Sequence, residues 1–189
     1  MKLGVAVSGQ GSNLRNLVER GFEVVAVVTN RPSCGGAEFA RGRGLPVGDF
    51  PQKRFPSAAH RDAAMAGFLL AQGVQLLVCA GYDRVFTRPL FDTFGGRIIN
   101  IHPSLLPAFA GGMDAVAQAL RAGVEVSGCT VHHVIEEVDA GPIILQSPVA
   151  VLPGDTVETL HARIQAEEHR LLPRAIVLVS DAARTAVGQ

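Results

Sequence analysis

The feature that most constrains this chain is the alternation of short apolar runs with amphipathic segments. Apolar runs of strand length lie at residues 3–7, 23–29, 46–49, 75–80 and 97–102. Segments with helix formers or helical spacing of apolar residues lie between them, near residues 14–18, 35–44, 58–72, 89–94 and 114–122. Strands that alternate with helices predict an α/β fold with a Rossmann-like, doubly wound and mostly parallel sheet.

The pattern changes in the last third of the chain. Two β-rich runs, residues 126–134 and 143–151, are separated only by a short loop. Strands joined in this way are expected to pair antiparallel. A long amphipathic helix should follow, capped by Asp155 or Thr156 and kinked or divided at Pro173. We therefore expect the sheet to end in an antiparallel hairpin backed by a long C-terminal helix.

Length, charge and cysteine content narrow the class of protein. A chain of 189 residues is expected to form one domain, residues 1–189. Seventeen basic residues balance seventeen acidic ones, so no overall field favours nucleic acid or an anionic membrane. The three cysteines are far apart and lack Cys-x-x-Cys spacing, which predicts neither disulfides nor a zinc site and fits a reducing cytoplasm. Without a signal-peptide pattern or an apolar run of about 20 residues, we expect a soluble cytoplasmic protein.

The stretch Arg97–Phe109 carries groups suited to chemistry. In it an apolar run ends in Asn100 and His102 and is stopped by Pro103. Residues of equal parity along a strand point to one face, so an amide and an imidazole should lie side by side at a strand's carboxyl end, where α/β sheets bind ligands. A proton-handling group beside a hydrogen-bond donor suits catalysis. The alternative from this pair alone is a buried, satisfied histidine and asparagine.

The turn Gly9–Asn13 lies where the first strand leads into the first helix. Glycines let a backbone approach an anion, and the N–H groups of Gly11, Ser12 and Asn13 would carry the positive end of the helix dipole. Leu14 replaces the third glycine of G-x-G-x-x-G, and G-K-[ST] is absent, so a monophosphate is a more modest inference than a dinucleotide or a nucleoside triphosphate. The alternative is a tight turn in which Ser12 or Asn13 only caps the helix.

Asp139 is a single carboxylate followed by Ala-Gly-Pro between the two β-rich runs. If the hairpin lies beside the Asn100 strand, Asp139 would reach His102, favour its imidazolium and orient it or pass protons through water. An exposed turn aspartate is the alternative. His132 and His133 face opposite sides of their strand, so only one of them can share a site with His102, and no metal cluster is expected.

The sequence offers no nucleophile for a covalent acyl-enzyme. It contains no G-x-S-x-G motif, and no cysteine lies near a histidine in a recognisable pattern. Direct transfer between two bound substrates is therefore the simpler chemistry.

Five blocks in chain order carry a family resemblance. They are Ser-Gly-x-Gly-Ser-Asn-Leu at 8–14, Ala-Gly-Tyr-x-Arg at 80–84, Asn-Ile-His-Pro-Ser-Leu-Leu-Pro at 100–107, Gly-x-Thr-Val-His at 128–132 and Val-Asp-x-Gly-Pro at 138–142. With them, over nearly its whole length, the chain resembles the phosphoribosylglycinamide formyltransferases of the folate-dependent formyltransferase family. The resemblance implies transfer of a formyl group from 10-formyltetrahydrofolate to the amine of glycinamide ribonucleotide in de novo purine biosynthesis.

The resemblance also implies roles for individual residues. Asn100, His102 and Asp139 match the catalytic triplet, in which the amide and the protonated imidazole stabilise the oxyanion and the carboxylate supports the imidazole and proton transfer. The implied binding residues are Gly11, Ser12, Asn13 and Glu168 for the ribonucleotide, and Arg84, Val85, Phe86 and Arg61 for the folate. The implied partners are these small molecules, with 10-formyltetrahydrofolate as cosubstrate and without a metal, nucleic acid or membrane, in a monomer or homodimer.

Two departures from the family pattern stand out. Tyr82-Asp83-Arg84 occurs where the family usually shows Phe-Met-Arg, which puts an acid beside a pocket meant for a flat pterin. After the Leu-Pro block the family usually continues Pro-Gly-x-His-x-His, whereas this chain has Ala-Gly-Gly-Met-Asp-Ala at residues 110–115. Met113 and Ala115 thus stand where the family has its two loop histidines.

Two other functions compete with formyl transfer. Hydrolysis of formyltetrahydrofolate uses the same fold, but such enzymes usually carry an extra N-terminal regulatory domain, and relatives that formylate transfer RNA carry an additional C-terminal domain. A binding module that holds folate or a sugar phosphate without turnover is the alternative of another class.

Overall fold

The structure, a computed structural model, describes residues 1–112 and 114–187. Met113, one of the loop substitutions noted above, lies outside them. The strands form a sheet in the order β3-β2-β1-β4-β5-β6-β7. The neighbouring strands from β3 to β5 pair in parallel, whereas β6 pairs antiparallel with β7, which confirms the predicted fold class. The chain divides into two compact units, residues 1–100 with 133–138, and residues 101–132 with the chain from 139 onwards. The single domain expected from length stays a prediction.

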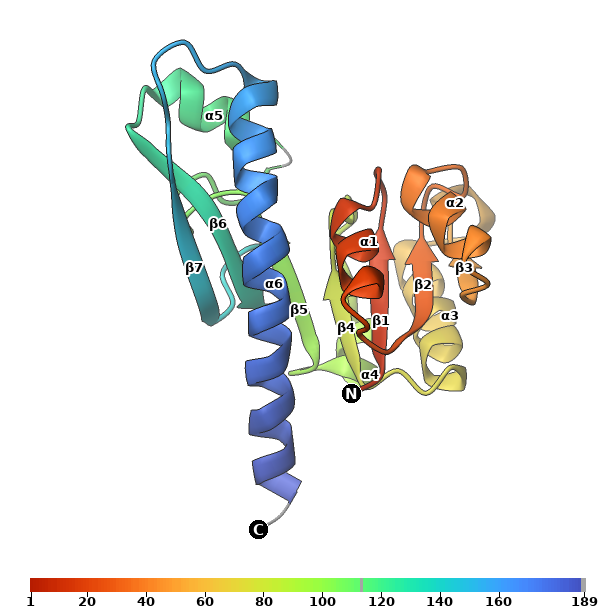
Figure 1. Ribbon diagram of the computed structural model, residues 1–189. Coiled ribbons are helices and arrows are strands. Elements are labelled where there is room, and N and C mark those ends of the chain that lie inside the picture. Colours follow the sequence, from red (N-terminus) through yellow and green to blue (C-terminus); the bar gives the residue numbers. More distant parts are fainter. Residues whose placement is uncertain (113, 188–189) are drawn as a thin grey trace. The chain divides into compact units, whose positions relative to one another are not determined.

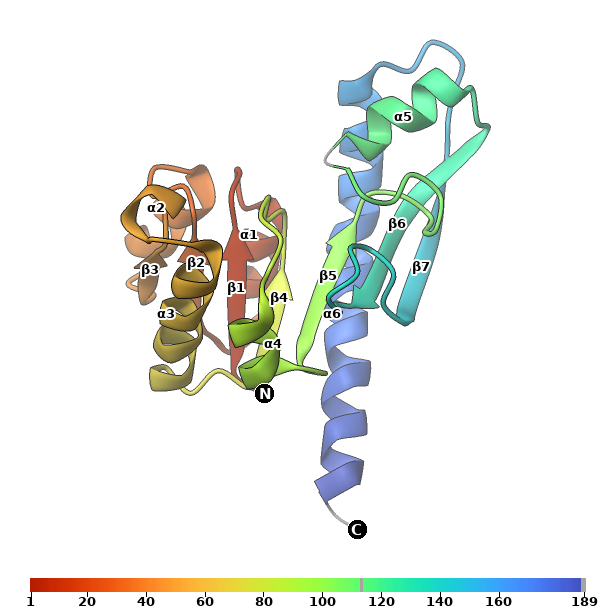
Figure 2. The same ribbon diagram turned by 180° about the vertical axis from the view of Figure 1, so that it is seen from behind.

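The first unit is the doubly wound part of the fold. Its elements are β1 (Leu3–Val7), α1 (Ser12–Glu19), β2 (Val24–Thr29), α2 (Gly35–Gly42), β3 (Val47–Asp49), the 3-10 turn η1 (Gln52–Arg54), α3 (Ala58–Ala71), β4 (Leu76–Cys79), α4 (Arg88–Phe94) and β5 (Ile98–His102), which continues into the second unit. Helix α1 covers one face of its sheet, whereas α3 and α4 cover the other (Figures 1 and 2). All residues of β1 and β4 are buried because helices cover both faces, which explains the continuous apolar runs.

The second unit contains the hairpin and the long helix. Its elements are α5 (Ala115–Ala122), β6 (Val126–His133), β7 (Ile143–Ala150) and α6 (Val157–Val187). The hairpin register runs from Val126 opposite Ala150 to His132 opposite Ile143, with an irregularity at Val131/His132. Helix α6 packs against β7 and α5 (Figure 1). None of the helices over the described residues is long and apolar enough to cross a membrane.

Helix α6 settles two expectations about its ends and its interior. The Thr156 hydroxyl accepts the N–H of Thr159 at 3.3 Å, so Thr156 is the predicted cap. Of the two effects expected at Pro173, a kink or a division, the division was wrong because α6 is continuous through this residue, and the kink stays a prediction. Proline removes one helical hydrogen bond, and burial of Leu172 and Ile176 on either side of it provides packing that holds the helix together.

Candidate active site

The loop that follows β5 is held by one buried hydroxyl. Thr130 Oγ1 on β6 donates to the Ser104 carbonyl at 2.7 Å and accepts the N–H of Leu106 at 3.0 Å. The Gln146 amide, on β7, donates both to this hydroxyl and to the Leu106 carbonyl at 2.9 Å. These bonds satisfy backbone groups that a buried loop would otherwise leave without partners. They fix the segment that begins at His102.

Gly128 allows this loop to approach β6. A Cβ atom at this position would collide with the Ser147 carbonyl and lie 2.7 Å from Leu105 Cδ2. Only glycine leaves room for both neighbours. The Gly-x-Thr part of the 128–132 block therefore shapes the loop, which accounts physically for that motif.

His102 lies at the end of β5 and is 5% exposed. Its Nε2 is 3.1 Å from the Phe109 carbonyl oxygen, and its Nδ1 is 3.4 Å from Asp139 Oδ2. A carbonyl and a carboxylate only accept hydrogen bonds, so both ring nitrogens face acceptors. An imidazolium satisfies this arrangement because each nitrogen then carries a proton.

Asp139 is held in the turn between the β-rich runs, and its side chain is only 10% exposed. Gly111 donates its N–H to Asp139 Oδ2 at 2.9 Å, and His132 Nε2 lies 3.6 Å from Oδ1. Burial opposes ionisation, but the hydrogen bonds from His132 and Gly111 and the charges of His102 and His132 outweigh it, so the pKa of Asp139 is lowered. The prediction that Asp139 reaches His102 is confirmed, and the exposed-turn alternative was wrong.

The backbone at this site is unusual. Phe109 (φ 57°) and Asp139 (φ 55°) are the non-glycine residues with positive φ in the described part of the chain. Positive φ is uncommon for residues other than glycine and persists where the surrounding structure imposes it. Both residues contact His102, one through its carbonyl and the other through its carboxylate. The strained backbone is thus concentrated around the imidazole.

Asn100 precedes His102 by two residues on β5 and is partly buried. The strand and the positions of both residues within it are as predicted. The catalytic role of Asn100 stays a prediction.

His132 is a site residue that sequence reasoning left undecided. Strand parity indicated that only one of His132 and His133 could join His102, and the structure selects His132, which is 1% exposed and faces Asp139. His132 is the last residue of the 128–132 block, so this motif contained a signal that could have identified it. Over residues 1–112 and 114–187, the structure contains no group of three or more His, Cys, Asp or Glu that could hold a metal ion.

The Gly9–Asn13 turn forms the start of α1. The N-cap is Gly11, with φ 74° and without a side-chain capping bond, so the alternative in which Ser12 or Asn13 is the cap was wrong. A Cβ atom at Gly11 would lie 2.5 Å from the Cα of Gly36. Glycine is therefore required at residue 11 both by φ and by this close approach. The first-turn N–H groups of a helix lack partners within the helix, which suits an anion.

The residues expected around the folate differ in exposure. Arg84 is 52% exposed at its side chain and Val85 is 61% exposed, whereas Phe86 is buried and stacks on Tyr82 with ring centroids 5.2 Å apart. Burial raises the pKa of Tyr82. Arg84 and Val85 can thus be reached by a ligand, and Phe86 supports them from the core side.

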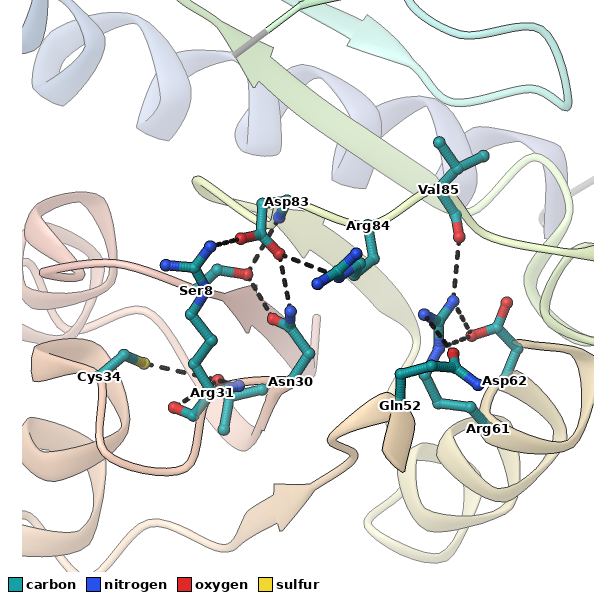
Figure 3. A network of polar contacts seen from close by, with 11 residues as sticks. Ser8, Asn30, Arg31, Cys34, Gln52, Arg61, Asp62, Asp83, Arg84 and Val85 are labelled. Atoms are coloured by element: carbon teal, nitrogen blue, oxygen red, sulfur yellow. Dashed lines mark hydrogen bonds and ion pairs between the residues drawn. The ribbon is translucent and has the colours of Figure 1, made fainter. Parts of the chain in front are cut away.

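Arg61 has a supporting position within the first unit. Its buried guanidinium donates to Asp62, to Gln52 at 3.2 Å and to the Val85 carbonyl at 3.0 Å (Figure 3). Asp62 in turn accepts the N–H and hydroxyl of Thr87, each at 2.7 Å. This pair holds the backbone of residues 85–87. A direct contact of Arg61 with folate stays a prediction.

Glu168 lies on α6 in the second unit and is buried. Burial raises the pKa of Cys129 to about 12, and the charges of Glu168 and Glu167 add to this effect. The carboxylate is thus close enough to β6 to act on that thiol. Its contact with a ribonucleotide stays a prediction.

Comparison with known proteins adds independent information. Residues 1–176 match the formyl transferase family. The phosphoribosylglycinamide formyltransferase of Bacillus subtilis is 41% identical over 181 residues, which are 93% of this chain and 92% of that protein. The trifunctional purine biosynthetic protein adenosine-3 of Gallus gallus is 42% identical over 97% of this chain, but the chain spans only 19% of its length.

A solved structure is similar as well. The crystal structure of glycinamide ribonucleotide transformylase 1 from Symbiobacterium toebii matches with a TM-score of 0.92 and 46% sequence identity, covering 96% of this chain and 88% of that chain. The family match extends over the residues that build the site. The chain belongs to the formyl transferase family.

Proposed function

We propose that this chain transfers the formyl group of 10-formyltetrahydrofolate to the amine of glycinamide ribonucleotide in purine biosynthesis. The observation that carries the proposal is the pairing of His102 Nδ1 with Asp139 Oδ2 at 3.4 Å, on a carboxylate whose pKa is lowered. A charged carboxylate holds an imidazole in the orientation and protonation state that stabilise an oxyanion. Membership of the formyl transferase family supports this use of the pair.

In the proposed reaction the ribonucleotide amine attacks the formyl carbon. A carbon–nitrogen bond forms, and the bond from the formyl carbon to N10 of the folate breaks once the tetrahedral intermediate collapses. Asn100 and the Nε2–H of His102 would donate to the oxyanion, so Nε2 would exchange the Phe109 carbonyl, 3.1 Å away, for this oxygen. The amine proton would pass through water near Asp139 to N10, which balances the transfer.

Substrate binding follows from the same proposal. The N–H groups of Gly11, Ser12 and Asn13 would hold the ribonucleotide phosphate, and Glu168 would contact this substrate. On the folate side, the proposed binding groups are Arg84, the backbone of Val85 and Phe86, and Arg61. We place the enzyme in the cytoplasm as a monomer or homodimer with small-molecule partners, and its three cysteines are free thiols.

One assay separates the competing functions. The purified protein with glycinamide ribonucleotide and 10-formyltetrahydrofolate should release tetrahydrofolate only when both are present. Release at an equal rate without the ribonucleotide would indicate a hydrolase. No release under either condition would indicate a binding module.

A further inference from the structure

Asp83 belongs to a closed ring of hydrogen bonds at the carboxyl ends of three strands. Its N–H donates to Ser8 Oγ at 3.0 Å, this hydroxyl donates to Asn30 Oδ1 at 2.6 Å, and the Asn30 amide donates back to Asp83 Oδ1 at 2.7 Å (Figure 3). Ser8 and Asn30 are 5% and 7% exposed. The ring therefore ties the residues after β1, β2 and β4 to one another in a buried place.

The same carboxylate also pairs with two arginines. Arg31 forms an ion pair with Asp83 Oδ2, and Arg84 Nε lies 3.6 Å from Oδ1 (Figure 3). Both guanidinium groups are more than half exposed, whereas the Asp83 side chain is 11% exposed. The acid noted in the sequence is thus directed into the protein toward the β1 and β2 ends. A methionine at this position could provide none of these charge-assisted bonds.

The turn at the start of α1 is connected to the ring by Ser8 and by contacts with Gly36. Ser8 directly precedes this turn and donates its N–H to the Gly81 carbonyl at 3.0 Å. On the other side, Gly36 donates its N–H to the Gly9 carbonyl at 3.0 Å and closely approaches Gly11. Gly36 follows the turn that begins at Arg31. Asp83 is therefore linked to residues 9–13 by two routes, along the chain from Ser8 and through the segment after Asn30 to Gly36, which contacts Gly9 and Gly11.

The segment 81–87 contains Asp83 itself and the residues expected to line the folate pocket. The Asp83 N–H donates to Ser8 Oγ, and the Asp83 carboxylate lies 3.6 Å from Nε of the next residue, Arg84. Movement of Arg84 or of the backbone after it would therefore act on the ring. Asp83 thus connects the folate loop (residues 81–87) with Ser8, which directly precedes the ribonucleotide turn (residues 9–13), and its carboxylate adds a connection to Asn30. These bonds supplement the backbone bond from Ser8 to Gly81. Segments with a shared support can be ordered together by either ligand.

We propose that Asp83 is a positioning residue that couples the ribonucleotide turn to the folate loop, so that binding of one substrate favours binding of the other. The inference rests on the proposed function, because it takes glycinamide ribonucleotide and folate as the two ligands. It assigns to Asp83 no contact with the reacting atoms.

The test is the affinity of a folate analogue without a transferable formyl group, measured by calorimetry with and without glycinamide ribonucleotide. In the wild-type protein the ribonucleotide should tighten binding about tenfold, which equals about 1.4 kcal/mol of coupling. In Asp83→Met the tightening should fall below about twofold, while the steady-state KM values rise and kcat stays within about threefold. Ser8→Ala opens the ring without altering the carboxylate and should lower the coupling in the same direction.

Asp92→Asn is the matched control, because Asp92 is an exposed carboxylate paired with Arg88 on α4, and both residues lie outside residues 9–13 and 81–87. It should keep wild-type coupling. If Asp83→Met does not fold, as judged by circular dichroism, Asp83→Asn takes its place, because its amide oxygen can still accept from Asn30. This variant leaves the two arginines without a carboxylate partner, so it should still lose part of the coupling. Coupling unchanged in the folded Asp83 and Ser8 variants, or absent from the wild type, overturns the inference. Wild-type binding and coupling without transfer would instead count against the proposed function alone.

Discussion

Thr130 is the residue whose replacement tests the architecture of the site most directly. In Thr130→Val the shape of the side chain is kept but the hydroxyl is lost. The Ser104 carbonyl and the Leu106 N–H then lose the partner that the structure gives them. The Gln146 amide loses its bond to the hydroxyl but keeps its bond to the Leu106 carbonyl, so it still has a partner.

The expected cost follows from these two buried groups. Each unsatisfied backbone group costs about 1–3 kcal/mol, so the free energy of unfolding should fall by between about 2 and 6 kcal/mol. Thr130→Ser is the matched control, because it keeps the hydroxyl and removes only a methyl group, at a cost of about 1 kcal/mol. Turnover should fall with Thr130→Val because the loop after His102 loses its support.

Urea unfolding followed by circular dichroism measures both variants. The midpoint should shift while the slope of free energy against urea stays constant, which shows that stability and not the mode of unfolding has changed. A loss below about 1 kcal/mol for Thr130→Val would refute the role given to this hydroxyl. An equal loss in Thr130→Ser would refute it too, since the methyl group would then carry the effect.

Three further predictions concern the catalytic groups and the folate side. His102→Ala and Asp139→Asn should each lose turnover while remaining folded by circular dichroism, and near-normal activity in either would contradict the catalytic assignment. The folded-state pKa of Asp139 is lowered, so its contribution to stability is present above the unfolded-state value and is lost as pH falls through the folded-state value; an acid-unfolding series of the wild type should show this loss, and Asp139→Asn should lack it. The buried Tyr82 hydroxyl has no hydrogen-bond partner among the described residues, so Tyr82→Phe should leave stability unchanged or raise it by about 1 kcal/mol in the same urea assay, and a loss of similar size would reveal a partner.

The elements of the fold were predictable because their signals are local. Strands β1 and β4 could be predicted because both faces of the sheet are covered there, so every side chain in them is apolar. The carboxyl ends of these strands then located the candidate ligand turns, as is general for such sheets. The pairing of Asp139 with His102 was also inferred, although it joins residues far apart in sequence, because the hairpin could be recognised from two β-rich runs.

Other features depend on contacts that no local pattern reveals. Gly36 faces Gly11 across a turn, and Asp83 reaches Ser8 and Asn30, which lie 75 and 53 residues away. The sequence showed an acid in an unexpected place but not its direction. Side-chain direction in a loop is set by the partners that the fold brings near, and these are known only once the strand order is known.

The loop after Phe109, in which the substitutions lie, supports the catalytic pair through its backbone. The loop contacts His102 and Asp139 through backbone groups, the Phe109 carbonyl and the Gly111 N–H. Side-chain replacements in residues 110–115 leave such groups in place, provided that the backbone can adopt the same path. Gly111 has φ 81°, a conformation that glycine adopts without strain, so this chain keeps the residue type that the path requires. The missing loop histidines therefore remove groups that could contact a substrate, but not the support of the imidazole and the carboxylate.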